Sequence, residues 1–391
     1  MNTNIFNNTK VAFSIKTDAQ LEKAYWLFKM IKNESLVKLG TGVTKFALKH
    51  HFPVEAIIKT TVFDHFCGGV TEEDTLDLVD KLYSKGVYSI LDYSVEGAET
   101  EESFNRAFKK TMELIDFAKD RKEMPFAVFK PTGLGRFEIY EKITAEKELN
   151  AEEQYEWNKI VERYDKLARK AKENDVPLMI DAEETWMQKA ADDLVEKMME
   201  KYNTEKPIVF NTLQLYRKDR LPYLKSLYER AKQKGFKIGM KLVRGAYMEK
   251  ERERAKELGY DDPICATKEL TDKNYNDTQR FMLEHIDDMK IYSGTHNENS
   301  ALYLMNLIDE FNLDKNDSRI WFGQLLGMSD HITFNLAKLG YNTSKYIPFG
   351  PVKDVMPYLI RRAEENTSVA GQTNRELELL SAERKRRKLD K

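Results

Sequence analysis

The stretch PIVFNTLQLYRKDRLPYLKSLYERAKQKGFKIGMKLV, residues 207–243, contains two short apolar runs separated by a long charged segment. The runs, at 207–213 and 237–243, have the length and the branched apolar content of buried strands. The segment between them is long enough for the crossover that two parallel strands require. This stretch therefore predicts a strand–helix–strand unit of a parallel sheet.

The same alternation extends along most of the chain. Further runs of this kind, each followed by a charge-rich segment, lie at 56–63, 87–93, 126–130, 177–181, 290–296 and 319–326. Eight strands that alternate with helices are the number in a closed (β/α)8 barrel. We therefore predict an α/β fold, a distorted (β/α)8 TIM-type barrel over residues 56–375.

The two ends of the chain have a different texture. Residues 1–55 are expected to form an N-terminal helical arm, with two amphipathic helices within 18–51 that break near Gly40 and Gly42. Residues 376–391 are expected to form a basic C-terminal tail, whose run ERKRRKLDK at 383–391 is interpreted as a frayed, solvated helix end rather than as a contact for anionic phospholipid.

A doubly wound open sheet is the competing fold. Such a sheet is expected to carry a glycine-rich turn directly after its first strand. The nearest candidate, GTGVTK at 40–45, follows a predicted helix and lacks the third glycine of that motif. The barrel is therefore favoured.

Composition excludes several classes of protein. The net charge is −2, with 33% charged and 41% hydrophobic residues, so no basic surplus favours nucleic acid. Two cysteines are too few for a disulfide framework, and no apolar run is long enough to span a bilayer. None of the six histidines is spaced as a zinc pair, so no metal is expected. We expect a cytoplasmic location, which peripheral contact with the inner membrane would not contradict.

Polar side chains follow several of the predicted strands. Active sites of (β/α)8 barrels lie at the carboxyl ends of their strands, so these side chains are expected to face one rim. A single polar residue there has an ordinary explanation, because every strand meets water where it ends. A rim rich in cations and amides, however, suits an anionic cofactor and a carboxylate substrate. The residues at these positions are Lys130, Asp181, Gln214, Lys241, Arg244, Thr295 and His296.

Two adjacent arginines, Arg361 and Arg362, lie in the predicted last helix, in PYLIRRAEEN at 357–366. Arg361 and Glu365 are four residues apart, so one interpretation is a solvated ion pair on a helix surface. The other is that the arginines bind a carboxylate, for which their planar guanidinium groups are suited.

Seven motifs, in this order along the chain, resemble those of the proline dehydrogenase family. They are VFKPTGLGRFE, MIDAEE, LQLY, KLVRGAY, GTHN, FGQLLGM and YIPFGPVKDVMPYLIRRAEEN. The resemblance is to the monofunctional, eukaryotic-like branch. It implies FAD-dependent oxidation of L-proline to 1-pyrroline-5-carboxylate, the first step of proline degradation to glutamate. It also implies a membrane quinone as electron acceptor and pyrroline-5-carboxylate dehydrogenase as a functional partner.

The resemblance also assigns roles to individual residues. Contacts to the substrate carboxylate fall on Lys130, Arg361 and Arg362, with Glu365 offsetting their charge. Apolar walls around the proline ring fall on Leu242, Tyr247 and Tyr346. Catalytic roles fall on Asp181, which would hold the cationic cluster in place, and on Lys241, beside flavin N5. FAD-contacting positions fall on Ala182, Gln214, Arg244, Gly245, Ala246, Thr295 and His296. Many bacterial members carry arginine where this chain has Lys241, and lysine cannot make the same bidentate contact.

Three other functions are compatible with these residues. A hydroxyproline dehydrogenase is similar to this family but carries serine at the position of Tyr346. A Schiff-base barrel aldolase would use Lys130 as its nucleophile. A helical scaffold would leave the rim residues solvated and would bind neither FAD nor proline analogues. A yellow purified protein would exclude the last two.

Overall fold

The computed structural model describes residues 3–33, 59–94, 99–368 and 370–389, and gives only the backbone for 3–4, 59–60, 363–368 and 370–372. Two compact units are present. The terminal unit comprises residues 1–96 and 324–391, and the central unit comprises residues 97–323.

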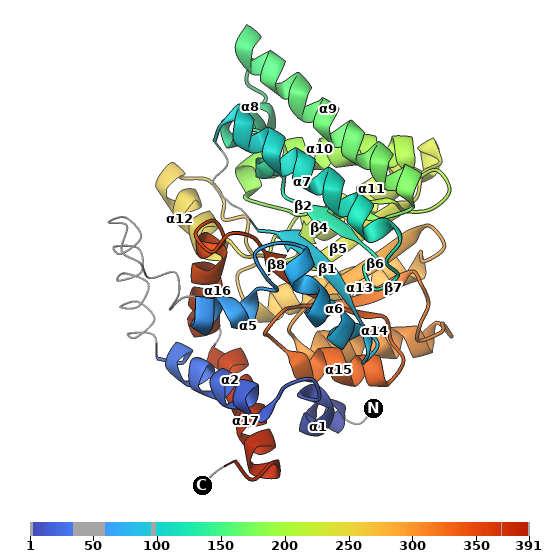
Figure 1. The fold of residues 1–391 in the computed structure, drawn as a ribbon. Coiled ribbons are helices and arrows are strands. Elements are labelled where there is room, and N and C mark those ends of the chain that lie inside the picture. Colours follow the sequence, from blue (N-terminus) through green and yellow to red (C-terminus); the bar gives the residue numbers. More distant parts are fainter. Residues whose placement is uncertain (1–2, 34–58, 95–98, 369, 390–391) are drawn as a thin grey trace. The chain divides into compact units, whose positions relative to one another are not determined.

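The described residues contain eight parallel strands in one sheet, in the order β1-β8-β7-β6-β5-β4-β3-β2 (Figure 1). The strands are β1 (Val87–Tyr93), β2 (Ala127–Phe129), β3 (Leu178–Ile180), β4 (Val209–Gln214), β5 (Ile238–Val243), β6 (Met289–Gly294), β7 (Ile320–Leu325) and β8 (Thr343–Phe349). From β2 to β8, strands that follow one another along the chain are neighbours in the sheet and are separated by helices, and β1 pairs with β8. The (β/α)8 class predicted from the sequence is therefore confirmed.

One strand was predicted in the wrong place. Residues 56–58 lie outside the described residues, and Lys59–Phe63 forms a π-helix rather than a strand. There Phe63 packs into an apolar cluster with Phe66 and Leu359. The missing strand is β8, in which Lys345 and Pro348 interrupt the apolar pattern.

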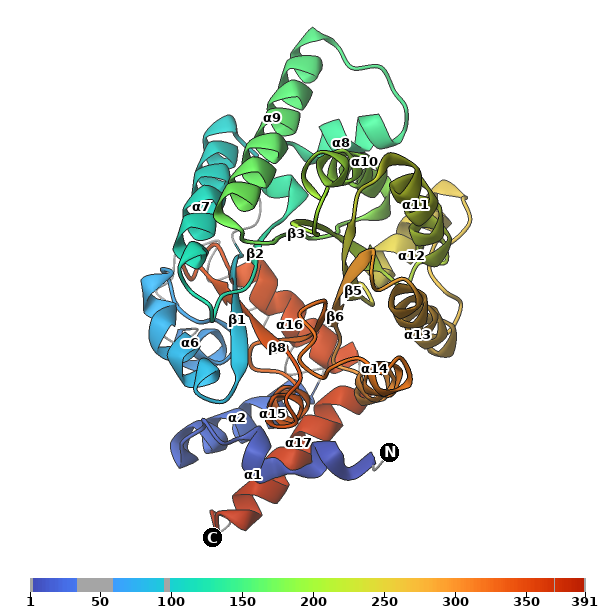
Figure 2. The same ribbon diagram turned by 90° about the vertical axis from the view of Figure 1, so that its right-hand side faces the viewer.

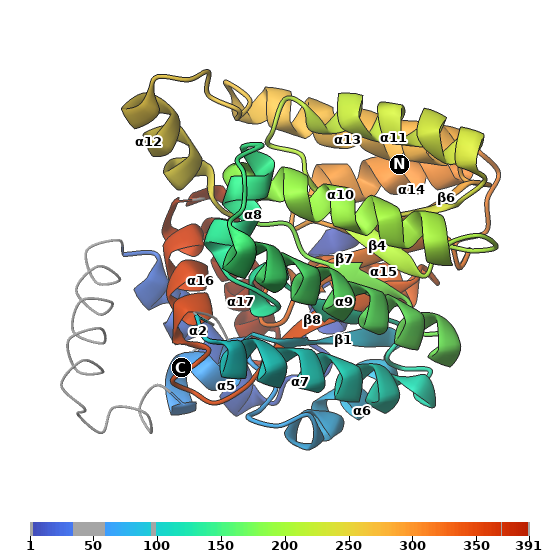
Figure 3. The same cartoon turned by 90° about the horizontal axis from the view of Figure 1, so that it is seen from above.

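Helices lie outside the strands of the central unit, as Figure 2 shows for α9, α10 and α11. The helices of this unit are α7 (Glu101–Lys119), η4 (Pro131–Gly133), α8 (Phe137–Thr144), α9 (Ala151–Asn174), α10 (Thr185–Tyr202), α11 (Arg220–Lys234), α12 (Met248–Leu258), α13 (Lys268–Glu284) and α14 (Glu298–Glu310). Figure 3 shows α8 and α12 at the end of the unit where α10 begins. This is the end at which β3 finishes, so it is the rim expected to carry the site.

Local sequence explains where these helices begin. The longest, α9, starts after Asn150, whose side chain accepts a hydrogen bond from the Glu153 backbone while the Glu153 carboxylate accepts one from Asn150. Such a capping box satisfies backbone donors that the first turn leaves unpaired. Thr100 begins α7 in the same way with Ser103.

Aromatic side chains fill part of the interior of the central unit. The ring of Phe126, just before β2, meets three rings edge to face: Phe210 at 5.6 Å, Tyr292 at 5.7 Å and Trp321 at 5.2 Å between centroids. These rings come from β4, β6 and β7. They occupy the space between strands near the start of β2, so the other end remains for polar side chains.

The terminal unit contains both ends of the described chain. Its helices are η1 (Thr3–Asn7), α1 (Thr9–Ala12), α2 (Asp18–Ile31), η2 (Lys59–Phe63), α5 (Asp64–Phe66), η3 (Glu73–Thr75), α6 (Leu76–Tyr83), α15 (Asp330–Lys338), α16 (Met356–Ser368) and α17 (Ala370–Arg386). Of the two helices predicted within 18–51, the first is α2, and the second falls outside the described residues. No helix in the described ranges has a stretch long and apolar enough to span a bilayer.

The run at 383–391 is not a frayed, solvated helix end in its described part, 383–389, because α17 continues through Arg386 and Glu383 is fully buried. Leu379 and Leu380 of α17 are buried against Phe28 of α2 and Phe13. Basic side chains of the segment are paired rather than free, since Arg384 bonds to Glu22 at 2.5 Å. These partners lie far away in sequence, so the charge pattern of the tail alone could not reveal them.

A buried charge network joins four segments of the terminal unit. Lys345 of β8 is fully buried and lies 2.8 Å from Asp330, which also pairs with Lys16 at 3.2 Å. Burial alone would raise the pKa of Asp330, but Lys16 and Lys345 together hold it well below its usual range. Glu376 of α17 accepts a hydrogen bond from the backbone of Ser329 beside this pair. A lysine is therefore accommodated in a buried strand because it has a carboxylate partner.

Candidate active site

Asp181 lies between two lysines at the rim of the central unit. It follows β3, Lys130 follows β2, and Lys241 is in β5. One carboxylate oxygen of Asp181 accepts a hydrogen bond from Lys241 Nζ, and the other is 4.0 Å from Lys130 Nζ. The Lys241, Asp181 and Lys130 side chains are only 7%, 17% and 18% exposed. The structure therefore brings together three residues that the sequence placed on separate strands.

The Asp181 carboxylate faces two ammonium groups, those of Lys241 and Lys130. The backbone N–H of Asp181 donates to the carbonyl of Phe129 at 3.0 Å, so the aspartate is fixed against the end of β2. Ammonium groups held in place at such a rim are suited to bind an anion.

Arg244, just beyond β5, is held on every side. Its guanidinium donates to Asp272 at 2.6 and 2.9 Å, to the Thr295 hydroxyl at 2.7 Å and to the Ser300 hydroxyl at 2.9 Å. It also lies over the ring of Tyr275, with its central carbon 4.6 Å from the centroid. Burial raises the pKa of Asp272, but hydrogen bonds from Lys268 and Arg244 outweigh that effect and lower it. Arg244 is therefore fixed before any ligand arrives.

Sequence reasoning predicted Arg244 and Thr295 but missed their supports. Asp272 and Tyr275 lie inside α13, in the charged run KELTDKNYNDTQ, and Ser300 is in α14. No spacing in that run distinguishes Asp272 from the solvated aspartates around it. Only the fold reveals that it faces Arg244.

Gln214, at the end of β4, has both ends of its amide engaged. Its nitrogen donates to the backbone carbonyl of Glu183 at 2.6 Å, and its oxygen accepts from the Tyr216 hydroxyl at 3.3 Å. These contacts fix the plane of the amide. They also join the end of β4 to the turn that follows Asp181.

The backbone after β5 approaches Tyr216 closely at Gly245. Its φ angle is +128°, and a Cβ there would lie 2.4 Å from the ring of Tyr216, so only glycine fits. Gly245 and Ala246 are exposed, and Tyr247, at the start of α12, is half-buried. Exposed backbone beside Arg244 is accessible to a ligand.

Three other predicted residues of the central unit differ in position. Ala182 and His296 are half-buried, directly after Asp181 and Thr295. Leu242 is fully buried. Because side chains alternate along a strand, Leu242 points to the opposite face of β5 from Lys241. The structure therefore does not bring Leu242 together with the lysine cluster.

The remaining predicted residues belong to the terminal unit. Arg362 of α16 is 8% exposed, and its guanidinium lies 5.3 Å from the centroid of the Tyr358 ring. Arg361 is half-buried, and the side chain of Glu365 lies outside the described residues. Arg362 is therefore not a solvated surface residue, whereas the ion pair of Arg361 with Glu365 stays a prediction. Tyr346 is buried within β8, in register with Ile90 of β1.

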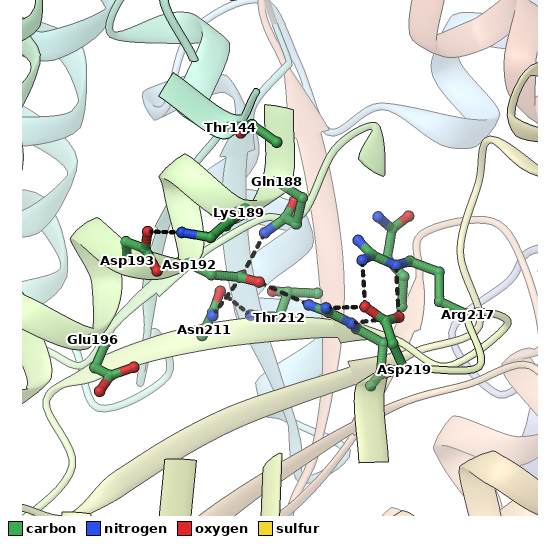
Figure 4. Close-up of polar contacts among 12 residues, drawn as sticks. Thr144, Gln188, Lys189, Asp192, Asp193, Glu196, Asn211, Thr212, Arg217 and Asp219 are labelled. Carbon is green, nitrogen blue, oxygen red and sulfur yellow. Dashed lines mark hydrogen bonds and ion pairs between the residues drawn. The ribbon is translucent and has the colours of Figure 1, made fainter. Parts of the chain in front are cut away.

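A hollow on the outer side of the central unit is a poor candidate for the site. It has a volume of about 520 Å³ and lies between α10 and α11. Figure 4 shows the network beside it, in which Gln188 and Asn211 donate to Asp192. Asp192 also pairs with Arg220 at 2.7 Å. The charged residues that line the hollow are mostly paired with one another, and none of them is a predicted site residue.

Comparison with known proteins gives consistent results. Residues 75–375 match the family model described as proline dehydrogenase. The chain is 44% identical to human mitochondrial proline dehydrogenase 1 over 60% of its own length and 40% of that protein. It is 33% identical to mitochondrial proline dehydrogenase 2 of Arabidopsis thaliana, over 85% of this chain and 79% of that protein. It is 36% identical to a carbapenem antibiotics biosynthesis protein, CarD, of Pectobacterium carotovorum, over 82% and 83%.

A solved structure shows the same fold. Proline utilization A from Bdellovibrio bacteriovorus, inactivated by N-propargylglycine, matches with a TM-score of 0.72 and 22% identity. The match covers 93% of this chain and 39% of that one. The chain therefore spans about two fifths of the length of both the human relative and this structure.

Proposed function

The chain belongs to the proline dehydrogenase family of oxidoreductases, and from this premise we propose that it oxidises L-proline to 1-pyrroline-5-carboxylate with FAD as cofactor. The observation that carries the proposal is the cluster of Lys130, Asp181 and Lys241. Proline has one carboxylate, and lysine ammonium groups held by an aspartate at the rim are suited to bind it.

The rim beyond this cluster fits an anionic dinucleotide. Arg244 is fixed by Asp272, Thr295 and Ser300, and a fixed guanidinium is well suited to bind the diphosphate of FAD. The other residues proposed to hold FAD are Ala182, Gln214, Gly245, Ala246, Thr295 and His296. When bound, FAD supplies the redox chemistry by accepting the electrons of the substrate.

The side chains have separate tasks in this proposal. Lys130 binds the substrate carboxylate, and Arg361 and Arg362 are proposed to contact it as well. Lys241 places its charge beside the flavin ring, where negative charge develops during the reaction. The proline nitrogen must be neutral to release hydride from the adjacent carbon. Positive charge nearby favours that neutral form, because it lowers the pKa of the ammonium group.

The proposal extends to the reactions on either side. Electrons would pass to a membrane quinone, and pyrroline-5-carboxylate dehydrogenase would consume the product in proline degradation to glutamate. We also propose a cytoplasmic setting with peripheral contact with the inner membrane. The quinone and the partner enzyme are supported by family membership alone.

The purified protein is expected to be yellow, and L-proline without oxygen should bleach its visible flavin absorption. The reason is that the cluster holds the substrate and the flavin takes its electrons. A dye or quinone should then restore the absorption. The measurement is an anaerobic spectral titration, with D-proline and NADH as controls. A flavin that NADH bleaches and L-proline does not would overturn the proposal.

Tyr346 leads us to propose that proline is preferred to trans-4-hydroxy-L-proline. This side chain is buried in β8, and we propose that its ring forms an apolar wall against the substrate ring. Such a wall rejects an added hydroxyl by on the order of 100-fold in kcat/KM. Tyr346→Ser should narrow the difference, mainly by weakening proline, while Tyr346→Phe should keep it. Equal kcat/KM for both substrates in the wild type would contradict this role.

A further inference from the structure

The turn that follows β3, residues 181–185, contacts three neighbouring parts of the central unit: the segment after β2, strand β5 and helix α12. Asp181 pairs with the two lysines described above. Glu184 forms an ion pair with Lys250 of α12, and Thr185 donates to Glu251 of the same helix. The remaining side chain, Glu183, turns toward the segment that carries Lys130.

Both carboxylate oxygens of Glu183 accept hydrogen bonds from that segment. One oxygen accepts the backbone N–H of Thr132 at 2.9 Å, and the other accepts the Thr132 hydroxyl at 2.7 Å. Thr132 lies in η4, two residues after Lys130. Since Glu183 is 7% exposed, water does not compete effectively for these bonds.

The backbone of Glu183 is itself fixed from two sides. Its N–H donates to the side-chain oxygen of Gln188 at 2.8 Å, and its carbonyl accepts from Gln214 at 2.6 Å. Gln188 is in turn bonded to Asp192, which belongs to the buried network in Figure 4. The Glu183 side chain that binds Thr132 therefore extends from a backbone position that is itself fixed by hydrogen bonds.

We propose that Glu183 is a positioning residue, which fixes the Lys130 ammonium for the substrate carboxylate by holding Thr132. Glu183 touches neither substrate nor cofactor in this proposal. The inference rests on the proposed function, because it assigns Lys130 to the carboxylate of proline. A misplaced binding group weakens binding even when it is still present.

The two hydrogen bonds between Glu183 and Thr132 do not depend on the charge of Glu183. Burial raises the pKa of this carboxyl to about 7, against the hydrogen bonds from Thr132. The ionisable groups around it are Lys130, Glu184, Tyr140 and Tyr164. An ionised carboxylate accepts both bonds. A protonated one can donate to the Thr132 hydroxyl while its other oxygen accepts the N–H, and a glutamine amide can do the same.

The second threonine–glutamate pair of this turn provides a matched control. Thr185 donates its N–H at 2.8 Å and its hydroxyl at 2.5 Å to Glu251, which is fully buried. These two hydrogen bonds repeat those between Thr132 and Glu183. Thr185, however, does not lie two residues after a lysine that is assigned to the substrate. Thr132→Val and Thr185→Val each remove one hydroxyl bond to a buried glutamate. Only the first should affect proline.

The test compares Glu183→Ala, Glu183→Gln, Thr132→Val and Thr185→Val in the FAD-loaded enzyme. We expect Glu183→Ala to raise the KM for L-proline about 10- to 100-fold, with kcat changed far less and FAD retained. The dissociation constant of tetrahydro-2-furoate, in which oxygen replaces the ring nitrogen, should rise in parallel. Thr132→Val should show a smaller rise, Glu183→Gln should stay near wild type, and Thr185→Val should change melting temperature without changing KM.

The outcomes separate the inference from its premise. A wild type that oxidises proline, with Thr132→Val matching Thr185→Val in KM, would overturn the role of Glu183 even if Glu183→Ala failed to fold. A Glu183→Gln variant as impaired as Glu183→Ala would also overturn it, because charge rather than position would then matter. A wild type whose flavin proline does not bleach would instead contradict the proposed function.

Discussion

Arg362→Met and Arg361→Met are each expected to raise the KM for L-proline roughly 30- to 5,000-fold while FAD stays bound. The range corresponds to about 2–5 kcal/mol, the usual cost of removing one partner of a desolvated, hydrogen-bonded charge pair. The effect should fall on KM because the arginines are proposed to contact only the substrate carboxylate. Arg362 is the stronger candidate, since it is buried in α16 and lies over Tyr358.

The measurement is steady-state kinetics with a dye acceptor, together with the flavin content of each variant. Arg375→Met provides a control from the same unit, because Arg375 pairs with Glu378 at 3.2 Å on the next helix. That variant should retain the wild-type KM. An unchanged KM in both test variants would mean that neither arginine binds the substrate.

Asp181→Asn is expected to lower kcat/KM by roughly 150- to 5,000-fold. Asparagine is nearly isosteric but carries no charge, so Lys241 and Lys130 would lose the carboxylate that they share. Removing one partner of a buried ion pair costs about 3–5 kcal/mol, because a charge is left without compensation. Lys241 is only 7% exposed, so its ammonium would be less well compensated and would shift. That shift would displace the positive charge that we propose lies beside the flavin.

A control for this variant exists at the start of β5, the strand that contains Lys241. There Lys237, directly before β5, pairs with Asp288 at 2.5 Å. Asp288→Asn removes a carboxylate from a lysine of the same barrel, but far from the carboxyl ends of the strands. Its kcat/KM should match wild type, whereas an Asp181→Asn enzyme that matched wild type would exclude the proposed role of the cluster.

The sequence predicted the fold class because strands buried on both faces produce continuous apolar runs. It failed where a strand contains a charge with a distant partner. Lys345 in β8 is paired with Asp330, which also pairs with Lys16, and neither of these residues is visible in a local pattern. The run at 56–63 has the composition of a strand, but its described part packs as a helix through Phe63.

The residues of the candidate site also fall into two groups, those that could be predicted from the sequence and those that could not. Lys130, Asp181, Gln214 and Arg244 could be predicted because each directly follows an apolar run. Thr132 and Asp272 could not be, since their importance comes from the residues they hold. Thr132 follows a proline in a short turn, and Asp272 is one of two aspartates on α13. Supporting residues of this kind are defined by three-dimensional contacts rather than by sequence spacing.

The buried Lys345 has a consequence for how the protein opens. Its ammonium pairs with Asp330 at the start of α15, Asp330 also pairs with Lys16 before α2, and Glu376 of α17 bonds to Ser329 beside them. If either terminal segment separated, Asp330 would lose Lys16 or Ser329 would lose Glu376, and a buried polar group would be left with fewer partners. Local fraying of α2 or α17 is therefore coupled to loss of β8, and segments more than 300 residues apart in sequence form one cooperative unit of unfolding.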